Sequence, residues 1–255
     1  MLAKERQNAI VEEVNINGSV LVKELARKYE VTEDSIRKDL TLLEKNGLLK
    51  KTYGGAMRIR NKISVNELTA SKRIGKHTQE KIQIARKAYE LLEDGDMIFL
   101  DLSTTNIELA RLLAQGSKKV EVVTNMVEIL SVLIENQYRN FIFIGGNLNQ
   151  EWDAFTGSIA NAQIENYRFD KSFLGLEGVD LQKGNVYNHS VDEAMTKKIV
   201  MEHSVRSYML MEYRKLNMEG NYAYAQIRDF DGVLCESELT ESQKEAFLKE
   251  DVECI

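Results

Sequence analysis

Residues 22–55 read VKELARKYEVTEDSIRKDLTLLEKNGLLKKTYGG, and this stretch decides the fold of the N-terminal part of the chain. The spacing of its apolar residues predicts two short helices around a tight turn at Glu30-Val31. The Gly54-Gly55 pair favours a compact hairpin after them, because glycine adopts positive φ without strain. We therefore expect two helices packed against each other and followed by a β-hairpin.

The helix after the turn has one apolar and one polar face. Thr32 is a good N-cap, and Glu33 and Asp34 occupy the first turn of the helix. These two acids either stabilise the positive end of the helix dipole or accept a hydrogen bond from a cytosine amine. Three residues recur at helical spacing and must face the core: Ile36, Leu40 and Leu43. A helix that presents hydroxyls and cations outward can enter the major groove of DNA. The outward residues are Ser35, Arg37, Lys38 and Thr41.

The hairpin that follows begins after Gly47, which ends the helix. Its Lys50 and Lys51, with Arg58 beyond it, are placed to lie against backbone phosphates. Together the helices and the hairpin predict a winged helix-turn-helix that binds DNA. The alternative is a helical hairpin that contacts another protein.

Two helices are expected before the turn, and the second of them is the first of the pair around it. Residues 3–15 have apolar residues at helical spacing, and Asn17-Gly18 ends this first helix. The second helix is expected to end near Tyr29 and to take its apolar face from Val20, Val22, Leu25 and Ala26.

Composition and charge divide the chain into two parts. Residues 1–62 contain 13 Lys and Arg against 9 Asp and Glu, whereas the remaining residues contain 21 against 31. A mildly basic head on an acidic body is typical of a DNA-reading module beside a domain of another kind. No apolar run approaches the ~18 residues of a membrane span, and the N-terminus does not resemble a signal peptide. We expect a cytoplasmic protein without membrane contact.

Strands and helices alternate in the second part. After a helix over residues 76–92, short apolar runs predict strands at 97–100, 120–123 and 141–144, each followed by a polar loop. Helices are expected at 106–113 and 127–136. This alternation predicts an α/β domain with a mostly parallel sheet covered on both faces.

Polar residues follow the three predicted strands and therefore converge at one edge of the sheet. Hydroxyls and backbone N–H groups at helix N-termini bind phosphate, which favours a phosphorylated polyol as ligand. The alternative for each loop is that its Ser and Thr residues cap helices and its glycines form turns. The residues concerned are Asp101, Ser103, Thr104, Thr105, Thr124, Asn125, Gly145 and Gly146.

The last third of the chain predicts further strands at 171–174, 207–211 and 232–235 and helices at 158–167, 192–203 and 241–249. Glu212 and Lys215 follow one of these strands, and Lys197 and Lys215 are candidate partners for phosphate or sugar oxygens. The scattered histidines and the two cysteines lack metal-ligand spacing. We expect neither a metal nor a cofactor.

The N-terminal 60 residues resemble the DeoR family of bacterial transcription regulators. The matching motifs are V-K-E-L-A at residues 22–26, V-T-E-D-S-I-R-K-D-L at 31–40 and G-L-L-K-K-T-Y-G-G-A at 47–56. Lys38 and Lys51 stand where the family has Arg, and Tyr53 stands where it has His. The resemblance implies DNA contacts from the recognition helix and the wing. The residues expected to make them are Thr32, Ser35, Arg37, Lys38, Thr41, Lys50, Lys51, Tyr53 and Gly54.

Residues 80–236 resemble the sensor domain of the same family, which is similar in fold to ribose-phosphate isomerases and glucosamine-phosphate deaminases. The matching elements include the loop 101–105, the Thr124-Asn125 and Gly145-Gly146 pairs, Glu193-Ala194 with Lys197, and the loop 212–215. Ser103 and Glu212 stand where the family has Gly and Asp. The resemblance implies a sugar-phosphate effector and an oligomeric repressor of carbohydrate genes.

We accordingly expect a DNA-binding domain at residues 1–57, a linker at 58–75 and a domain for ligand sensing and oligomerisation at 76–255. The expected partners are a double-stranded DNA operator, a sugar phosphate and further copies of the chain in a homodimer or homotetramer. The alternative is a sugar-phosphate isomerase or deaminase with an appended helical module, in which Asp101, Glu212 and Lys215 move protons. We expect a regulator and not an enzyme.

Overall fold

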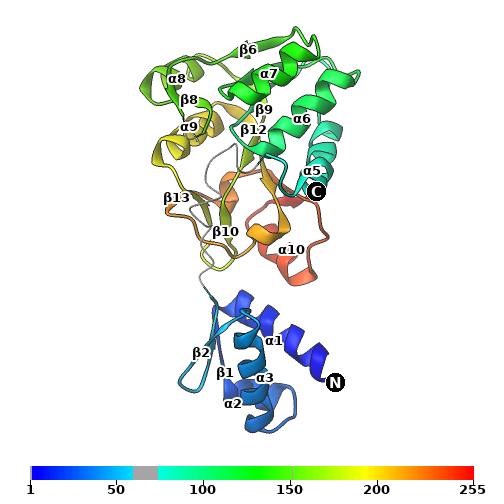
Figure 1. The fold of residues 1–255 in the computed structure, drawn as a ribbon, viewed down its shortest axis with the longest axis vertical. Coiled ribbons are helices and arrows are strands. Elements are labelled where there is room, and N and C mark those ends of the chain that lie inside the picture. Colours follow the sequence, from blue (N-terminus) through cyan, green and yellow to red (C-terminus); the bar gives the residue numbers. More distant parts are fainter. Residues whose placement is uncertain (1, 60–73, 151) are drawn as a thin grey trace. The chain divides into compact units, whose positions relative to one another are not determined.

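The computed structural model describes residues 2–59, 74–150 and 152–255, which divide into two compact units, Met1–Asn61 and Lys62–Ile255 (Figure 1). Most of the expected linker, residues 60–73, lies outside the described residues. We call the first unit the head and the second the sensor domain.

The head is a three-helix unit with a small antiparallel sheet. Its sheet has the order β1-β3-β2, and its apolar side chains form one core that includes Leu25, Ile36, Leu40 and Leu43. The elements are α1 (Ala3–Asn17), β1 (Ser19–Leu21), α2 (Val22–Lys28), α3 (Glu33–Lys45), β2 (Lys50–Thr52) and β3 (Gly55–Met57).

One expected element of the head differs. Val20 belongs to strand β1 and not to the second helix, which begins only at Val22. Val20 pairs with Ala56 of the wing strand β3, so a partner more than thirty residues away fixes its conformation. Gly55 makes this pairing possible, because a Cβ at Gly55 would lie 2.0 Å from the carbonyl oxygen of Val20.

The sensor domain is built on a parallel sheet of seven strands in the order β15-β14-β12-β9-β4-β5-β6. All its pairings are parallel. This confirms the predicted α/β class. The strands are β4 (Met97–Leu100), β5 (Glu121–Thr124), β6 (Phe141–Phe143), β9 (Phe169–Gly175), β12 (Ser204–Met211), β14 (Gly232–Cys235) and β15 (Glu253–Cys254).

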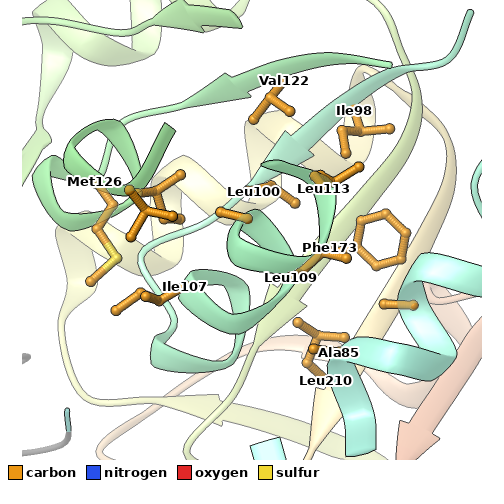
Figure 2. Packing of buried hydrophobic residues seen from close by; sticks show 14 of the residues in the cluster. Ala85, Ile98, Leu100, Ile107, Leu109, Leu113, Val122, Met126, Phe173 and Leu210 are labelled. Atoms are coloured by element: carbon orange, nitrogen blue, oxygen red, sulfur yellow. The ribbon is translucent and has the colours of Figure 1, made fainter. Parts of the chain in front are cut away.

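Helices cover both faces of this sheet because successive strand residues alternate sides. Ile98 and Leu100 pack with α5, α6 and α7 on one face, whereas Phe99 packs with α8, α9 and α10 on the other. Figure 2 shows part of the first core, where helix and strand side chains meet. The helices are α5 (Thr78–Glu90), α6 (Thr104–Gln115), α7 (Val127–Glu135), α8 (Ser158–Ile164), α9 (Val191–Glu202) and α10 (Glu241–Leu248).

Two further antiparallel sheets supplement the seven-stranded one. A small sheet of the order β10-β11-β13 packs its Val179, Val186 and Tyr224 into the second core, and β7 pairs with β8 in a hairpin. The sequence did not predict these elements. They are β7 (Asn147–Asn149), β8 (Ala154–Thr156), β10 (Gly178–Asp180), β11 (Asn185–Asn188) and β13 (Tyr222–Gln226), with 3-10 turns η2 (Tyr213–Lys215) and η3 (Ile227–Asp229) nearby in sequence.

Candidate functional site

The head presents one polar face of α3 to solvent. Thr32 caps the helix, since its side chain accepts a hydrogen bond from the backbone N–H of Ser35 at 3.3 Å. Ile36, Leu40 and Leu43 of α3 are buried in the head core, as predicted. Arg37, Lys38 and Thr41 are therefore exposed on the opposite side.

Two carboxylates hold the Arg37 side chain. Its Nη2 lies 2.6 Å from Oε2 of Glu33, and its Nη1 lies 3.2 Å from Oδ1 of Asp34. The arginine side chain remains 56% exposed. The two acids of the first helical turn thus orient a guanidinium that is still open to solvent.

The wing is tied to the recognition helix by Lys51. Its backbone N–H donates to Oε1 of Glu44 at 2.8 Å, and its Nζ donates to Oγ1 of Thr41 at 2.7 Å. Tyr53 is fully exposed in the turn between β2 and β3, where Gly54 has a φ of +83°. Lys50 is also exposed. The two bonds of Lys51 therefore join the wing to α3, and the nine residues predicted to contact DNA lie on α3 with its N-cap, on β2 and in the turn after it.

Asp39 has a structural role that was not predicted from the sequence. It is buried, and its two carboxylate oxygens accept from Nε of Arg6 and Nε2 of Gln7, both at 2.7 Å. These bonds anchor α3 to α1. Its position between Ile36 and Leu40 on the inward face was the available signal, because a buried acid needs a partner.

The sensor domain has a pocket at the carboxyl ends of its central strands. Strand order reverses between β4 and β9, since the chain adds β5 and β6 on one side and β12, β14 and β15 on the other. Such switch points are where open α/β sheets bind ligands. The lining residues are Ser103, Thr104, Thr105, Gly175, Leu176, Glu177, Asn188, Glu193, Lys197 and Lys215.

Lys197 of α9 is the central cation of this pocket and is 2% exposed. Its Nζ lies 2.7 Å from Oε1 of Glu193 and 3.2 Å from Oδ2 of Asp101, and it donates to the carbonyl oxygen of Gly175 at 2.6 Å. The ring of Tyr224 lies 5.6 Å from the same nitrogen. Burial works against the ammonium charge, but Glu193 and Asp101 outweigh it and hold the pKa of Lys197 above its ordinary value.

Asp101 organises the loop that leads into α6. Its carboxylate accepts from the backbone N–H groups of Ser103 at 3.0 Å and Gly175 at 2.9 Å, and from Nδ2 of Asn106 at 2.7 Å. Ser103 in turn caps α6 by accepting from the backbone N–H of Asn106. The carboxylate is thus occupied by donors and positions the hydroxyls of Thr104 and Thr105 at the helix N-terminus.

Glu212 and Lys215 form a second charged pair at the end of β12. Nζ of Lys215 lies 3.3 Å from Oε1 of Glu212, and Nε of Arg214 lies 2.9 Å from Oε2 of Glu212. Burial favours the neutral acid, but the two cations outweigh it and lower the pKa of Glu212 to about 2. Lys215 lines the pocket, whereas Glu212 supports it from behind.

Six of the predicted ligand residues do not line this pocket: Asp101 and Glu212, which bond to residues that do line it, and Thr124, Asn125, Gly145 and Gly146. Thr124 donates to the carbonyl oxygen of Leu100, and Asn125 donates to that of Phe155. The glycines Gly145 and Gly146 follow β6, the outermost strand on that side of the sheet. Gly145 and Gly146 thus lie two strands away from β4, whereas the side chains of Thr124 and Asn125 are bonded to backbone carbonyl groups.

The pocket contains groups of the kind that bind an anion. Two ammonium groups and the hydroxyls at the N-terminus of a twelve-residue helix favour a phosphate. A carboxyl group with a pKa of about 2, such as Glu212, is a weak base at neutral pH. The cavity volume is about 10 Å³, room for about one water, so a larger ligand must displace the lining side chains.

Comparison with known families defines the class of this protein. Residues 6–62 match the family described as "DeoR-like helix-turn-helix domain", and residues 76–237 match "DeoR C terminal sensor domain". The chain therefore belongs to the DeoR family of transcription regulators, as its motifs predicted.

Among curated relatives, the chain is similar to a "Lactose phosphotransferase system repressor" of Staphylococcus aureus. The two are 32% identical over 238 residues, which cover 92% of each chain. It is also 29% identical over 251 residues to a "Putative aga operon transcriptional repressor" of Escherichia coli O157:H7, with 98% of this chain and 93% of the relative covered.

Among solved structures, ribose 5-phosphate isomerase A from Methanocaldococcus jannaschii matches 55% of each chain, with a TM-score of 0.41 and 16% identity. The described helices of this chain include none that is both long and apolar enough to cross a membrane.

Proposed function

We propose that this protein is a repressor of carbohydrate-metabolism genes that binds a DNA operator through its head and releases it in response to a phosphorylated sugar. The observation that carries the sensing half is the pocket at the switch point. It combines Lys215 and the α6 N-terminus, which bind phosphate, with Lys197, Glu177 and Glu193, which bind sugar oxygens and hydroxyls. We place this regulator in the cytoplasm, where its operator lies, and assign it no enzymatic activity.

For the head, we propose that α3 enters the major groove and that Arg37 reads guanine there. Lys38 and the hydroxyls of Thr32, Ser35 and Thr41 position the helix on phosphates. Glu33 and Asp34, which pair with Arg37, either compete with the DNA for its guanidinium group or hold that group at the edge of the base.

The wing supplies further contacts to the DNA backbone. Its Lys50, Lys51 and Tyr53 are exposed along β2 and the turn, and Gly54 gives the turn its positive φ. Contacts of lysine with phosphate predict an affinity that falls steeply with salt.

A homodimer or homotetramer supports specific binding by such a small head. Two heads would read half-sites about 34 Å apart, one helical turn of DNA. The oligomer then has one form in which the two heads are spaced to bind DNA and one in which they are not. The effector changes the DNA affinity by as much as its own affinities for these two forms differ.

Gel-shift titration with the DNA upstream of its own gene tests the DNA-binding half. The full chain is expected to bind at low salt, and Arg37→Ala to bind about 10- to 100-fold more weakly. Arg86→Ala is a matched control, since it removes an exposed arginine of the sensor domain and the same charge. Equal loss from both variants would refute the assignment of Arg37.

Thermal denaturation with a panel of sugar phosphates tests the sensing half. A ligand at about one hundred times its dissociation constant stabilises the protein by about 2.7 kcal/mol. The ligand that stabilises the chain should also weaken the gel-shift complex. Stabilisation without any change in DNA binding would contradict the proposed coupling, and turnover of the sugar phosphate would revive the enzymatic alternative.

A further inference from the structure

Asn188 has a buried amide with an unused donor. It is the last residue of β11, where it pairs with Tyr222 of β13, and it is 1% exposed. Its side chain lines the switch-point pocket. Within the described parts of the chain, its Nδ2 has no hydrogen-bond acceptor.

The orientation of this amide is fixed by Lys197. Oδ1 of Asn188 lies 3.4 Å from Nζ of Lys197 and accepts a hydrogen bond from it. Turning the amide over would place two donors against each other, because an ammonium cannot accept a hydrogen bond. The donor that remains must therefore be Nδ2.

A buried donor without an acceptor is costly, and such groups in folded proteins call for an explanation. Four buried side-chain atoms of the described residues lack a partner: Oδ1 of Asn106, Oδ1 of Asn125, Nδ2 of Asn188 and the hydroxyl of Tyr224. Of their residues, Asn188 alone lines the switch-point pocket. A ligand in that pocket is thus the partner that this amide is placed to meet.

We infer that Asn188 determines specificity for the carbon chain of the effector by donating a hydrogen bond from Nδ2 to one of its hydroxyl or carbonyl oxygens. This inference rests on the proposed function. The effector belongs to the class of monosaccharide phosphates that carry such an oxygen away from the phosphate.

The neighbouring carboxylates indicate why the sugar and not the phosphate meets Asn188. Glu177 and Glu193 line the same pocket and are buried, so they repel a dianion. A sugar hydroxyl group can bond to both, because it accepts a hydrogen bond from the Asn188 amide and donates one to a carboxylate. The phosphate is left to Lys215 and the N-terminus of α6.

The test compares binding of sugar phosphates with binding of inorganic phosphate by the full chain. Ribose 5-phosphate, fructose 6-phosphate, glucosamine 6-phosphate and inorganic phosphate are titrated by calorimetry into the native chain and into Asn188→Ala. We expect the variant to bind the preferred sugar phosphate about tenfold or more weakly and inorganic phosphate within about threefold of the native affinity.

Two further variants make the result unambiguous. Asn188→Leu removes the donor without opening space, and it replaces the alanine variant if that protein does not fold. Asn185→Ala is the matched control, because Asn185 belongs to the same strand and bonds with Gln226 and Tyr187 outside the pocket lining. It should bind every ligand as the native chain does.

The possible outcomes separate this inference from the proposed function. Unchanged affinity of the Asn188 variants for sugar phosphates overturns the inference and leaves the proposed function standing. An equal loss for sugar phosphate and inorganic phosphate also overturns it, since the amide would then serve the phosphate or the pocket as a whole. A native chain that binds none of the sugar phosphates overturns the proposed function, and the inference with it.

Discussion

A Cβ on Gly175 would lie 2.4 Å from the Cβ of Ser103, so these two residues fit together only because Gly175 has no side chain. Gly175 is the last residue of β9. Ser103 is the N-cap of α6 and lies in the loop that joins this helix to β4, the strand beside β9. The serine that stands where the family has a glycine is thus accommodated by the backbone of the adjacent strand, and it adds a cap to the helix whose first residues line the pocket.

This contact predicts a compensating pair of substitutions. Gly175→Ala should lower the free energy of unfolding by about 1–3 kcal/mol, because the new methyl group overlaps Ser103. Ser103→Gly removes the overlap, so the double variant should be more stable than Gly175→Ala alone, with a coupling of about 1–3 kcal/mol. Urea unfolding followed by the fluorescence of Trp152 measures this, since Trp152 is the single tryptophan and lies in the sensor-domain core. Additive effects would show that the two residues do not clash.

A second prediction concerns the buried charges around Lys197. Lys197→Met leaves Asp101 and Glu193 without their cation and should destabilise the sensor domain by about 3–5 kcal/mol. Trp152 fluorescence during urea unfolding again provides the measurement. The control is Lys198→Met, which changes the next, more exposed lysine of α9 and should cost less than about 1 kcal/mol. Equal losses would mean that the ion pairs of Lys197 contribute nothing specific.

A third prediction is a pH dependence that belongs to Glu212. Its pKa falls from 4.5 to about 2 in the folded protein, so its contribution is fully present above about pH 4.5 and is lost as the pH decreases towards 2. Glu212→Gln should therefore cost about 2–3 kcal/mol at neutral pH, and its stability should converge with that of the native chain in acid.

Unfolding experiments across this pH range need a second carboxylate for comparison. Glu238 is 88% exposed and pairs only with the surface residue Lys244 among the contacts described for it. Glu238→Gln should therefore leave the profile between pH 2 and 4.5 unchanged. A profile of Glu212→Gln that runs parallel to the native one at all pH values would contradict a lowered pKa.

The parts of the fold that sequence reasoning predicted are those with a strong local pattern. Strands β4 and β14 were predicted with their observed bounds because each is a short apolar run. The core face of α3 followed from the helical spacing of Ile36, Leu40 and Leu43. Such patterns need no knowledge of distant partners.

The parts that it missed depend on distant partners. Strand β11 reads Asn-Val-Tyr-Asn, and it is a strand because β10 and β13 pair with it on both sides. Asn188 therefore had no detectable signal as a pocket residue. Thr124 and Asn125 follow a predicted strand, but their side chains donate to the carbonyl oxygens of Leu100 and Phe155, which lie 24 and 30 residues away in the sequence.

The last prediction concerns two adjacent glycines of the wing that have different roles. Gly55→Ala should abolish DNA binding and unfold the head, because its methyl group would overlap the carbonyl oxygen of Val20. Gly54→Ala meets no atom within 4 Å and costs only the strain of its positive φ, about 1 kcal/mol. Circular dichroism and gel shift report on the head, while Trp152 fluorescence verifies that the sensor domain is intact. DNA binding by Gly55→Ala at native strength would show that β1 need not pair with the wing.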